Sequence, residues 1–190
     1  MKQTKRGPAR RKRDIGPLLR AVLLAARKHR AQLRKDRETP YVAHPLRVAM
    51  ILEHVFGVSD LDMLAAAVLH DTIEDTQTDH DDLVPAVGRR AADLVAALTK
   101  DKRMPEAARE EAFLAQLVAA GPEAMVIKLA DIYDNLLDAG DLAASDRRKT
   151  VAKARKQWRA FEGRLGPEWN RVKHAFRSHL TKMARAPAAR

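Results

Sequence analysis

The chain has 190 residues and a mass of 21.2 kDa, and 46% of its residues are hydrophobic, which suits one domain with a single core. No run of about 18 uninterrupted apolar residues occurs, so no membrane span is expected, and no apolar signal-peptide segment follows the basic N-terminus. Cysteine is absent, which excludes disulfides and thiolate metal sites and fits a cytoplasmic location.

The formal net charge of +11 is concentrated at the two ends of the chain. Residues 1–13 hold seven Lys or Arg and no acid, residues 171–190 hold six and no acid, and residues 14–170 therefore sum to −2. Such charge blocks are typical of solvated tails, and the alternative is weak contact with RNA, the ribosome or another anionic surface. The expected organisation is a basic tail over 1–13, a folded domain over 14–170 and a basic helix or tail over 171–190.

Apolar residues recur at helical spacing through most of the chain and predict an all-α fold, a bundle or orthogonal array of helices in one domain. The predicted helices cover 18–30, 46–56, 61–70, 87–98, 107–120, 123–137, 147–162 and 168–183. Ser59 and Ser145 are predicted N-caps. No Gly-rich phosphate loop of the Walker or Rossmann kind occurs, so any phosphate chemistry must use side chains and metal.

The stretch LHDTIEDT (69–76) places one imidazole and three carboxylates directly after an apolar run. His70 and Asp71 would point about 100° apart on a regular helix, but at a helix end the backbone can turn and both can reach one ion. Imidazole with carboxylate oxygen suits Mn²⁺, Fe²⁺, Co²⁺ or Zn²⁺. Taken alone, the pair favours a simpler interpretation, in which His70 caps the helix and the acids face water, because short motifs match often.

Two further segments add residues of the same chemistry. YVAHP (41–45) places His44 just before a proline at the start of a predicted helix. KLADIYDNL (128–136) places Asp131 in an apolar stretch, where an unpaired carboxylate would be costly to bury. A metal ion would supply the cation that a buried Asp131 needs, and the alternative is a salt bridge with Lys or Arg.

These three segments, in this order and at these separations, resemble the HD-domain hydrolases of guanosine tetraphosphate and pentaphosphate. That family includes the hydrolase half of Rel/Spo-type bifunctional enzymes and the stand-alone small alarmone hydrolases. KHRAQLRKDRETPYVAHP (28–45) and VAALTKDK (95–102) also resemble family segments, and the likeness covers residues 18–160. The resemblance implies a mainly helical HD-domain fold and one Mn²⁺ ion. The ligands that it implies for this ion are His44, His70, Asp71 and Asp131.

The resemblance also implies roles for the residues around the ion. Glu74 and Asp75 would act on the hydrolytic water. Attack at the phosphorus on the 3′ oxygen would release pyrophosphate and leave GDP or GTP. The residues expected to contact the nucleotide are Arg34, Lys35, Tyr41, Lys102 and Asn135.

Three departures from the family pattern bear on the choice of substrate. The turn KDRETPY (35–41) lacks the usual glycine, residues 132–134 stand where basic residues are common, and Glu106 stands where some small hydrolases have a lysine. Asp134 is expected to add negative charge near the phosphate pocket. An adenine alarmone, NADPH or a nucleoside monophosphate therefore remains an alternative substrate for an HD phosphohydrolase.

A second class of function is non-enzymatic. In it, the chain is a helical module whose basic ends bind RNA or a ribosome, with a degenerate metal site. It predicts salt-sensitive binding and no metal-dependent turnover. The presence of all the expected ligands and both acids favours the enzyme. A synthetase domain is not expected in a chain of this length, and the sequence does not indicate an oligomeric state.

Overall fold

The computed structural model describes residues 14–185, so the predicted tail 1–13 and the last five residues of the segment 171–190 lie outside the described residues. The described chain is helical, and Leu33 and Pro40 make an isolated antiparallel bridge in it. The helices are α1 Gly16–Lys28, α2 Ala43–Met50, the π-helix η1 Ile51–Phe56, α3 Leu61–Leu69, α4 Thr72–Asp75, α5 His80–Val87, α6 Arg89–Leu98, α7 Glu106–Ala120, α8 Pro122–Asp138, η2 Ala139–Asp141, α9 Ala144–Phe161, η3 Glu162–Arg164, η4 Pro167–Trp169 and α10 Asn170–Arg185. The all-α expectation is confirmed.

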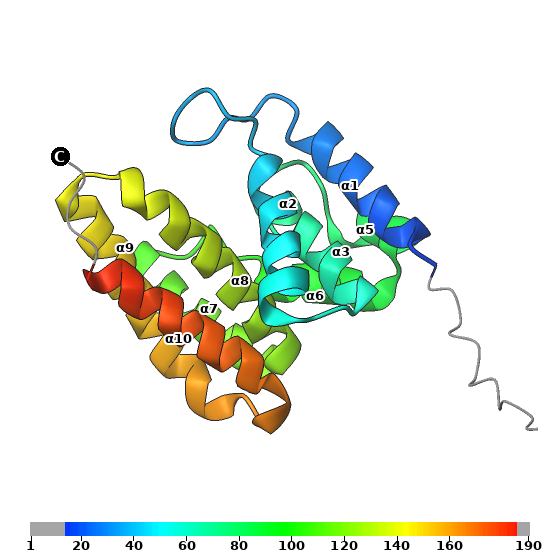
Figure 1. Ribbon diagram of the computed structural model, residues 1–190. Coiled ribbons are helices and arrows are strands. Elements are labelled where there is room, and N and C mark those ends of the chain that lie inside the picture. Colours follow the sequence, from blue (N-terminus) through cyan, green and yellow to red (C-terminus); the bar gives the residue numbers. More distant parts are fainter. Residues whose placement is uncertain (1–13, 186–190) are drawn as a thin grey trace, which may run out of the picture.

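Helix α3 is central because it is apolar on every side. Residues 63–69 are all buried, as expected of a helix with no polar face. Helices α1, α2, α6 and α8 pack around it, and α7 packs against α8 (Figure 1). The turn that follows α3 therefore leaves the middle of the hydrophobic core, and this turn contains His70 and Asp71. Over residues 14–185, no helix is both long and apolar enough to span a bilayer.

The last two long helices, α9 and α10, pack against each other and against α8 (Figure 1). Helix α10 buries Val172, Phe176 and Leu180, which follow each other at helical spacing. Trp158 of α9 stacks on Phe176 with ring centroids 5.1 Å apart. The basic segment after residue 170 is thus an amphipathic helix as far as residue 185, and its apolar face is part of the core. The domain boundaries themselves stay a prediction.

Both predicted serine caps are wrong. Asp60, not Ser59, caps α3, because its carboxylate accepts hydrogen bonds from two backbone N–H groups of the first turn. A carboxylate also interacts favourably with the positive end of the helix dipole, which a hydroxyl does less well. Helix α9 begins at Ala144, so Ser145 lies inside its first turn. Sequence periodicity also missed the short helix α5, which a capping box between Asp79 and Asp82 begins.

The turn between α1 and α2 contains a left-handed residue, Arg37, with φ of 62°. A side chain in this conformation costs about 1–2 kcal/mol relative to the right-handed region. Asp36 stabilises the turn, since its carboxylate accepts hydrogen bonds from the backbone N–H groups of Glu38 and Thr39, both at 2.9 Å. The Thr39 hydroxyl also donates to Asp36, and it is the main reason why the pKa of Asp36 falls to about 2. These bonds close the turn without the usual glycine.

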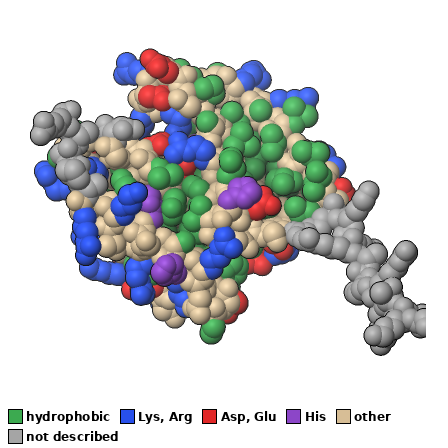
Figure 2. Space-filling model, viewed as in Figure 1, with side chains coloured by type: hydrophobic (Ala, Val, Ile, Leu, Met, Phe, Trp, Pro, Cys, Tyr) green, Lys and Arg blue, Asp and Glu red, His purple; other side chains and the backbone are tan. Residues whose placement is uncertain are grey.

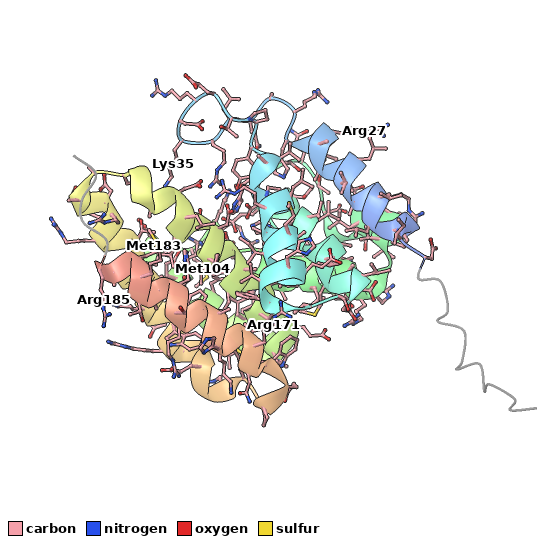
Figure 3. All side chains as sticks on the ribbon, in the orientation of Figure 1. Arg27, Lys35, Met104, Arg171, Met183 and Arg185 are labelled. Atoms are coloured by element: carbon pink, nitrogen blue, oxygen red, sulfur yellow. The ribbon has the colours of Figure 1, made fainter. Side chains whose placement is uncertain are left out.

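Gly57 ends the π-helix η1 in a left-handed conformation, with φ of 77°. Arg171, at the start of α10, donates to the carbonyl oxygens of His54 and Val55 and packs over Gly57 (Figure 3). A Cβ atom at position 57 would lie 2.7 Å from Nη1 of Arg171. We expect Gly57→Ala to lower the free energy of unfolding by about 1–2 kcal/mol, from backbone strain together with displacement of Arg171. Urea unfolding followed by circular dichroism measures this change.

Gly163→Ala is the matched control, because a Cβ atom at position 163 would meet no other atom within 4 Å. Its effect should be close to zero or slightly stabilising, since alanine restricts the unfolded chain. Equal losses of stability in the two variants would contradict the role given to Gly57.

Candidate metal centre and active site

His70 and Asp71 stand at the junction between α3 and α4. His70 is the C-cap of α3, and Asp71 is the N-cap of α4, so the backbone turns at these two residues. Nε2 of His70 consequently lies 3.0 Å from Oδ2 of Asp71. A continuous helix would not bring the side chains of adjacent residues together in this way.

His44 from α2 and Asp131 from α8 meet this corner. Nε2 of His44 lies 3.2 Å from Oδ1 of Asp131 and 3.7 Å from Oδ2 of Asp71. Nε2 of His70 lies 3.9 Å from the same Asp131 oxygen. His44, His70 and Asp131 are buried, and their ligand atoms all lie within 4.8 Å of one another. Segments far apart in the sequence thus bring two imidazole nitrogens and two carboxylate oxygens around one point.

Hydrogen bonds set the tautomers of both imidazoles. Nδ1 of His70 donates to the carbonyl oxygen of Ala67 at 2.9 Å, and Nδ1 of His44 donates to Oδ2 of Asp134 at 2.6 Å. Because these acceptors carry no proton, Nδ1 is the protonated nitrogen of each histidine, and Nε2 is the nitrogen that each can offer to an ion in the cluster. Nε2 of His70 is buried and has no hydrogen-bond partner among the described residues, an arrangement that a bound ion would satisfy. Imidazole nitrogen with carboxylate oxygen fits a divalent transition-metal ion.

The electrostatics of the cluster favour positive charge. Burial lowers the pKa of His44, but its hydrogen bonds with Asp131 and Asp134 outweigh this effect and raise the pKa to about 9. Burial also lowers the pKa of His70, but the negative charge of the adjacent Asp71 has a larger effect, and the pKa of His70 is raised overall. Burial raises the pKa of Asp131, but Lys128 and the two imidazoles hold it well below its usual range. The carboxylates are therefore charged and ready to bind a cation.

Two neighbours on α8 orient Asp131. Nζ of Lys128 lies 2.6 Å from Oδ2, while Nδ2 of Asn135 donates to Oδ1 at 2.6 Å. Oδ2 of Asp131 thus forms a salt bridge with Lys128, the partner that the sequence offered as an alternative to a metal ion. Oδ1 of Asp131 faces the two imidazoles. Lys128 was not among the predicted site residues, although its spacing of three residues from Asp131 is a recognisable signal. Asn135 was expected beside the nucleotide, and in the structure its amide contacts Asp131.

Asp134 contacts His44 and two arginines, and its expected place near the phosphate pocket stays a prediction. It is fully buried, and its Oδ1 lies 2.6 Å from Nε of Arg47. Arg34 lies 3.7 Å from Asp134 and 2.5 Å from Asp138, which also binds Arg47 at 2.8 Å. The negative charge of Asp134 is therefore compensated behind the metal cluster, and Arg34 is part of this network.

Tyr41 contacts the cluster directly. Its hydroxyl donates to Oδ2 of Asp71 at 2.5 Å, and its ring lies 5.0 Å from that of the buried His29. Burial and the charge of Asp71 raise the pKa of Tyr41, so the phenol keeps its proton and remains a donor. Tyr41 thus orients the carboxylate of Asp71 in this structure.

The two acids of α4 are held by the segment after α6. Oε2 of Glu74 accepts the backbone N–H of Lys100 at 3.2 Å. Nζ of Lys102 donates to Oδ1 of Asp75 and to the carbonyl oxygen of Glu74, both at 2.7 Å. Burial lowers the pKa of the nearby Lys128, but the negative charges of Asp131, Asp71 and Glu74 together outweigh this effect and raise it. Lys102 therefore stabilises the α4 turn, and Lys35 lies exposed on the turn before α2 (Figure 3).

Comparison with known proteins shows clear relatives. Residues 21–167 match the model of the HD domain family. The chain is similar to human guanosine-3′,5′-bis(diphosphate) 3′-pyrophosphohydrolase MESH1, with 46% identity over 126 residues, 66% of this chain and 70% of the relative. It is 35% identical over 159 residues to the bifunctional (p)ppGpp synthase/hydrolase SpoT of Escherichia coli K12, which is 80% of this chain and 22% of that one. A solved structure described as a metazoan ortholog of SpoT that hydrolyzes ppGpp superposes with a TM-score of 0.73 and 30% identity, covering 85% of this chain and 94% of that chain.

Proposed function

The chain belongs to the HD-domain family, and we propose that it is a Mn²⁺-dependent hydrolase that removes the 3′-pyrophosphate from guanosine tetraphosphate and pentaphosphate. The names of the human and bacterial relatives support this substrate. The main structural support is the pair of imidazole Nε2 atoms that face Asp131 and Asp71, each imidazole held by a hydrogen bond at Nδ1. The cytoplasmic location stays a prediction.

The residues that would hold the ion are His44, His70, Asp71 and Asp131. When bound, the ion polarises the 3′-pyrophosphate and lowers the pKa of a coordinated water molecule. The side chain of Asp71 is 19% exposed, whereas those of His44 and His70 are 2% and 3% exposed. We therefore place the approach of the substrate on the Asp71 side of the cluster.

Glu74 would accept the proton of the attacking water. Its Oε2 is fixed by the backbone of Lys100, which leaves Oε1 for the water. The water oxygen bonds to the phosphorus that is attached to the 3′ oxygen. The bond between this phosphorus and the 3′ oxygen breaks, and pyrophosphate leaves. The 3′ oxygen takes up a proton, so the products are GDP or GTP and pyrophosphate. Asp75, bound to Lys102, would hold the α4 turn in position and support this step.

Contacts with the nucleotide are proposed for Arg34, Lys35, Tyr41, Lys102 and Asn135. Lys35 is exposed on its turn and can reach a phosphate directly. Arg34 and Lys102 bind Asp138 and Asp75 in this structure, so a phosphate group must displace these carboxylates to reach them. Such an exchange replaces one charge-assisted hydrogen bond by another and costs little.

Asp134→Asn is expected to weaken metal binding about tenfold while the fold is kept. Asparagine can still accept the Nδ1 proton of His44, but it lacks the charge that makes the imidazole a stronger ligand. Replacing such outer partners typically costs 10–100-fold in affinity. Titration calorimetry with Mn²⁺ measures the change independently of turnover.

Asp138→Asn is the matched control. Asp138 binds the same two arginines as Asp134, but its side chain is 40% exposed and makes no contact with His44. Its metal affinity should stay near that of the wild type. If both variants lost metal affinity equally, the loss would come from the contacts with Arg34 and Arg47 and not from the hydrogen bond to His44.

The substrate assignment is tested with a panel of nucleotides. Purified protein with Mn²⁺ is incubated with guanosine tetraphosphate, guanosine pentaphosphate, an adenine alarmone, NADPH and nucleoside monophosphates, and the products are separated by anion-exchange chromatography. Pyrophosphate with GDP or GTP is the expected result. Orthophosphate from monophosphates or NADPH, with no pyrophosphate from the guanosine alarmones, would contradict the assignment.

A further inference from the structure

The net positive charge of the described residues comes from the segment that contains the last two long helices, α9 and α10. Residues 144–185 contain thirteen Lys or Arg and three Asp or Glu, a formal charge of +10. Residues 14–143 contain fifteen Lys or Arg and twenty-two Asp or Glu, a formal charge of −7. Figure 2 shows several Lys and Arg side chains along the side of the molecule formed by α9 and α10. The near-neutral sum for 14–170 thus concealed two regions of opposite charge.

A groove of about 420 Å³ runs between α9 and α10 and is lined by four arginines. Arg155 and Arg159 stand about one turn apart on α9, and Arg177 and Arg185 about two turns apart on α10. All four side chains are exposed, and Figure 3 shows Arg185 at the end of α10, directed away from the core. The groove therefore presents two rows of guanidinium groups to solvent.

These guanidinium groups are poorly compensated. Arg155, Arg159 and Arg185 have no ion-pair partner among residues 14–185, and Arg177 has Glu162 at 3.5 Å. The arginines behind the metal cluster, by contrast, bind carboxylates at 2.5–2.8 Å. Neighbouring like charges repel each other, and a bound polyanion would relieve this repulsion.

The groove fits a phosphate backbone better than other polyanionic partners. The large apolar residues in it are covered, since Trp158 is 6% and Leu180 is 7% exposed, and the exposed apolar side chain is only the methyl group of Ala184. It therefore offers no apolar anchor for a bilayer, no apolar centre for a protein interface and no aromatic face for a base. Planar guanidinium groups match phosphate oxygens in pairs.

We propose that the α9–α10 groove binds the phosphodiester backbone of a nucleic acid, independently of base sequence. This binding uses Arg155, Arg159, Arg177 and Arg185 and needs neither the metal cluster nor its substrate. RNA and DNA share the chemistry that the groove recognises, so both belong in the test.

The test compares the full chain with the variant Arg155→Gln, Arg159→Gln, Arg177→Gln by fluorescence anisotropy. The probes are an RNA and a single-stranded DNA of the same sequence, about 20 nucleotides long, at several salt concentrations. The wild type should bind with a steep salt dependence. The variant should lose at least tenfold in affinity at about 0.1 M salt, and the slope of log K against log salt should shrink by about 2. Circular dichroism and hydrolysis of guanosine tetraphosphate should both be unchanged.

The matched control removes the same charge from the acidic part of the chain, as Arg27→Gln, Arg30→Gln, Arg89→Gln, and should bind as the wild type does. A second variant replaces the seven Lys and Arg of residues 1–13 by Gln and should keep most of the affinity. A loss in either variant as large as that in the groove variant would overturn the assignment. Binding to anionic lipid vesicles but to neither nucleic acid would overturn it as well.

Discussion

Asp71→Ala is expected to lower the affinity for Mn²⁺ by more than about 100-fold and to abolish hydrolysis. The substitution removes the carboxylate oxygen that lies 3.0 Å from Nε2 of His70 and 3.7 Å from Nε2 of His44. Loss of an outer partner alone costs 10–100-fold in metal affinity, so loss of an anionic ligand should cost more. Titration calorimetry and metal analysis of the dialysed protein measure the binding directly.

Tyr41→Phe is the control for this result. It removes the hydroxyl that donates to Asp71 but leaves the carboxylate itself, so the metal affinity should fall by about tenfold or less. Asp71→Asn, which keeps the shape of the side chain, separates loss of the ligand from loss of the fold. Retention of tight metal binding by a folded Asp71 variant would show that Asp71 is not a ligand.

Glu74→Gln should have the opposite pattern, with metal binding retained and kcat reduced by about 10²–10⁴-fold. The amide can still accept the backbone N–H of Lys100, so the α4 turn should keep its conformation. It cannot take a proton from water, and the step assigned to Glu74 is lost. Steady-state kinetics with guanosine tetraphosphate, alongside calorimetry with Mn²⁺, separate the two effects.

Glu111→Gln is the matched control, because it removes an exposed carboxylate on α7 and should change neither kcat nor metal affinity. Should Glu74→Gln lose its metal to the same degree as Asp71→Ala, Glu74 would belong among the ligands and not act on the water. A kcat close to that of the wild type would equally remove Glu74 from the chemical step.

Local patterns in the sequence determined most of the helices and the residues of the metal cluster. Periodic apolar residues predict helices because a face must be buried, and α3, apolar on every side, could only lie in the core. The residues His44, His70, Asp71 and Asp131 could be identified from the sequence because each lies in a short local motif. Their proposed roles still await the experiments above.

Only the tertiary structure decided which charges far apart in the sequence compensate each other. Asp134 binds His44, ninety positions away, and Arg34 binds Asp138 across 104 positions, so neither pairing has a signal in local spacing. The structure likewise placed the basic helices α9 and α10 side by side, so that arginines of both line one groove. Periodicity reports which side of a helix is buried, whereas the partner of a charged side chain depends on how the helices pack. For this chain the sequence indicated the proposed ligands, and the packing of α2, α3 and α8 decided how their side chains are held.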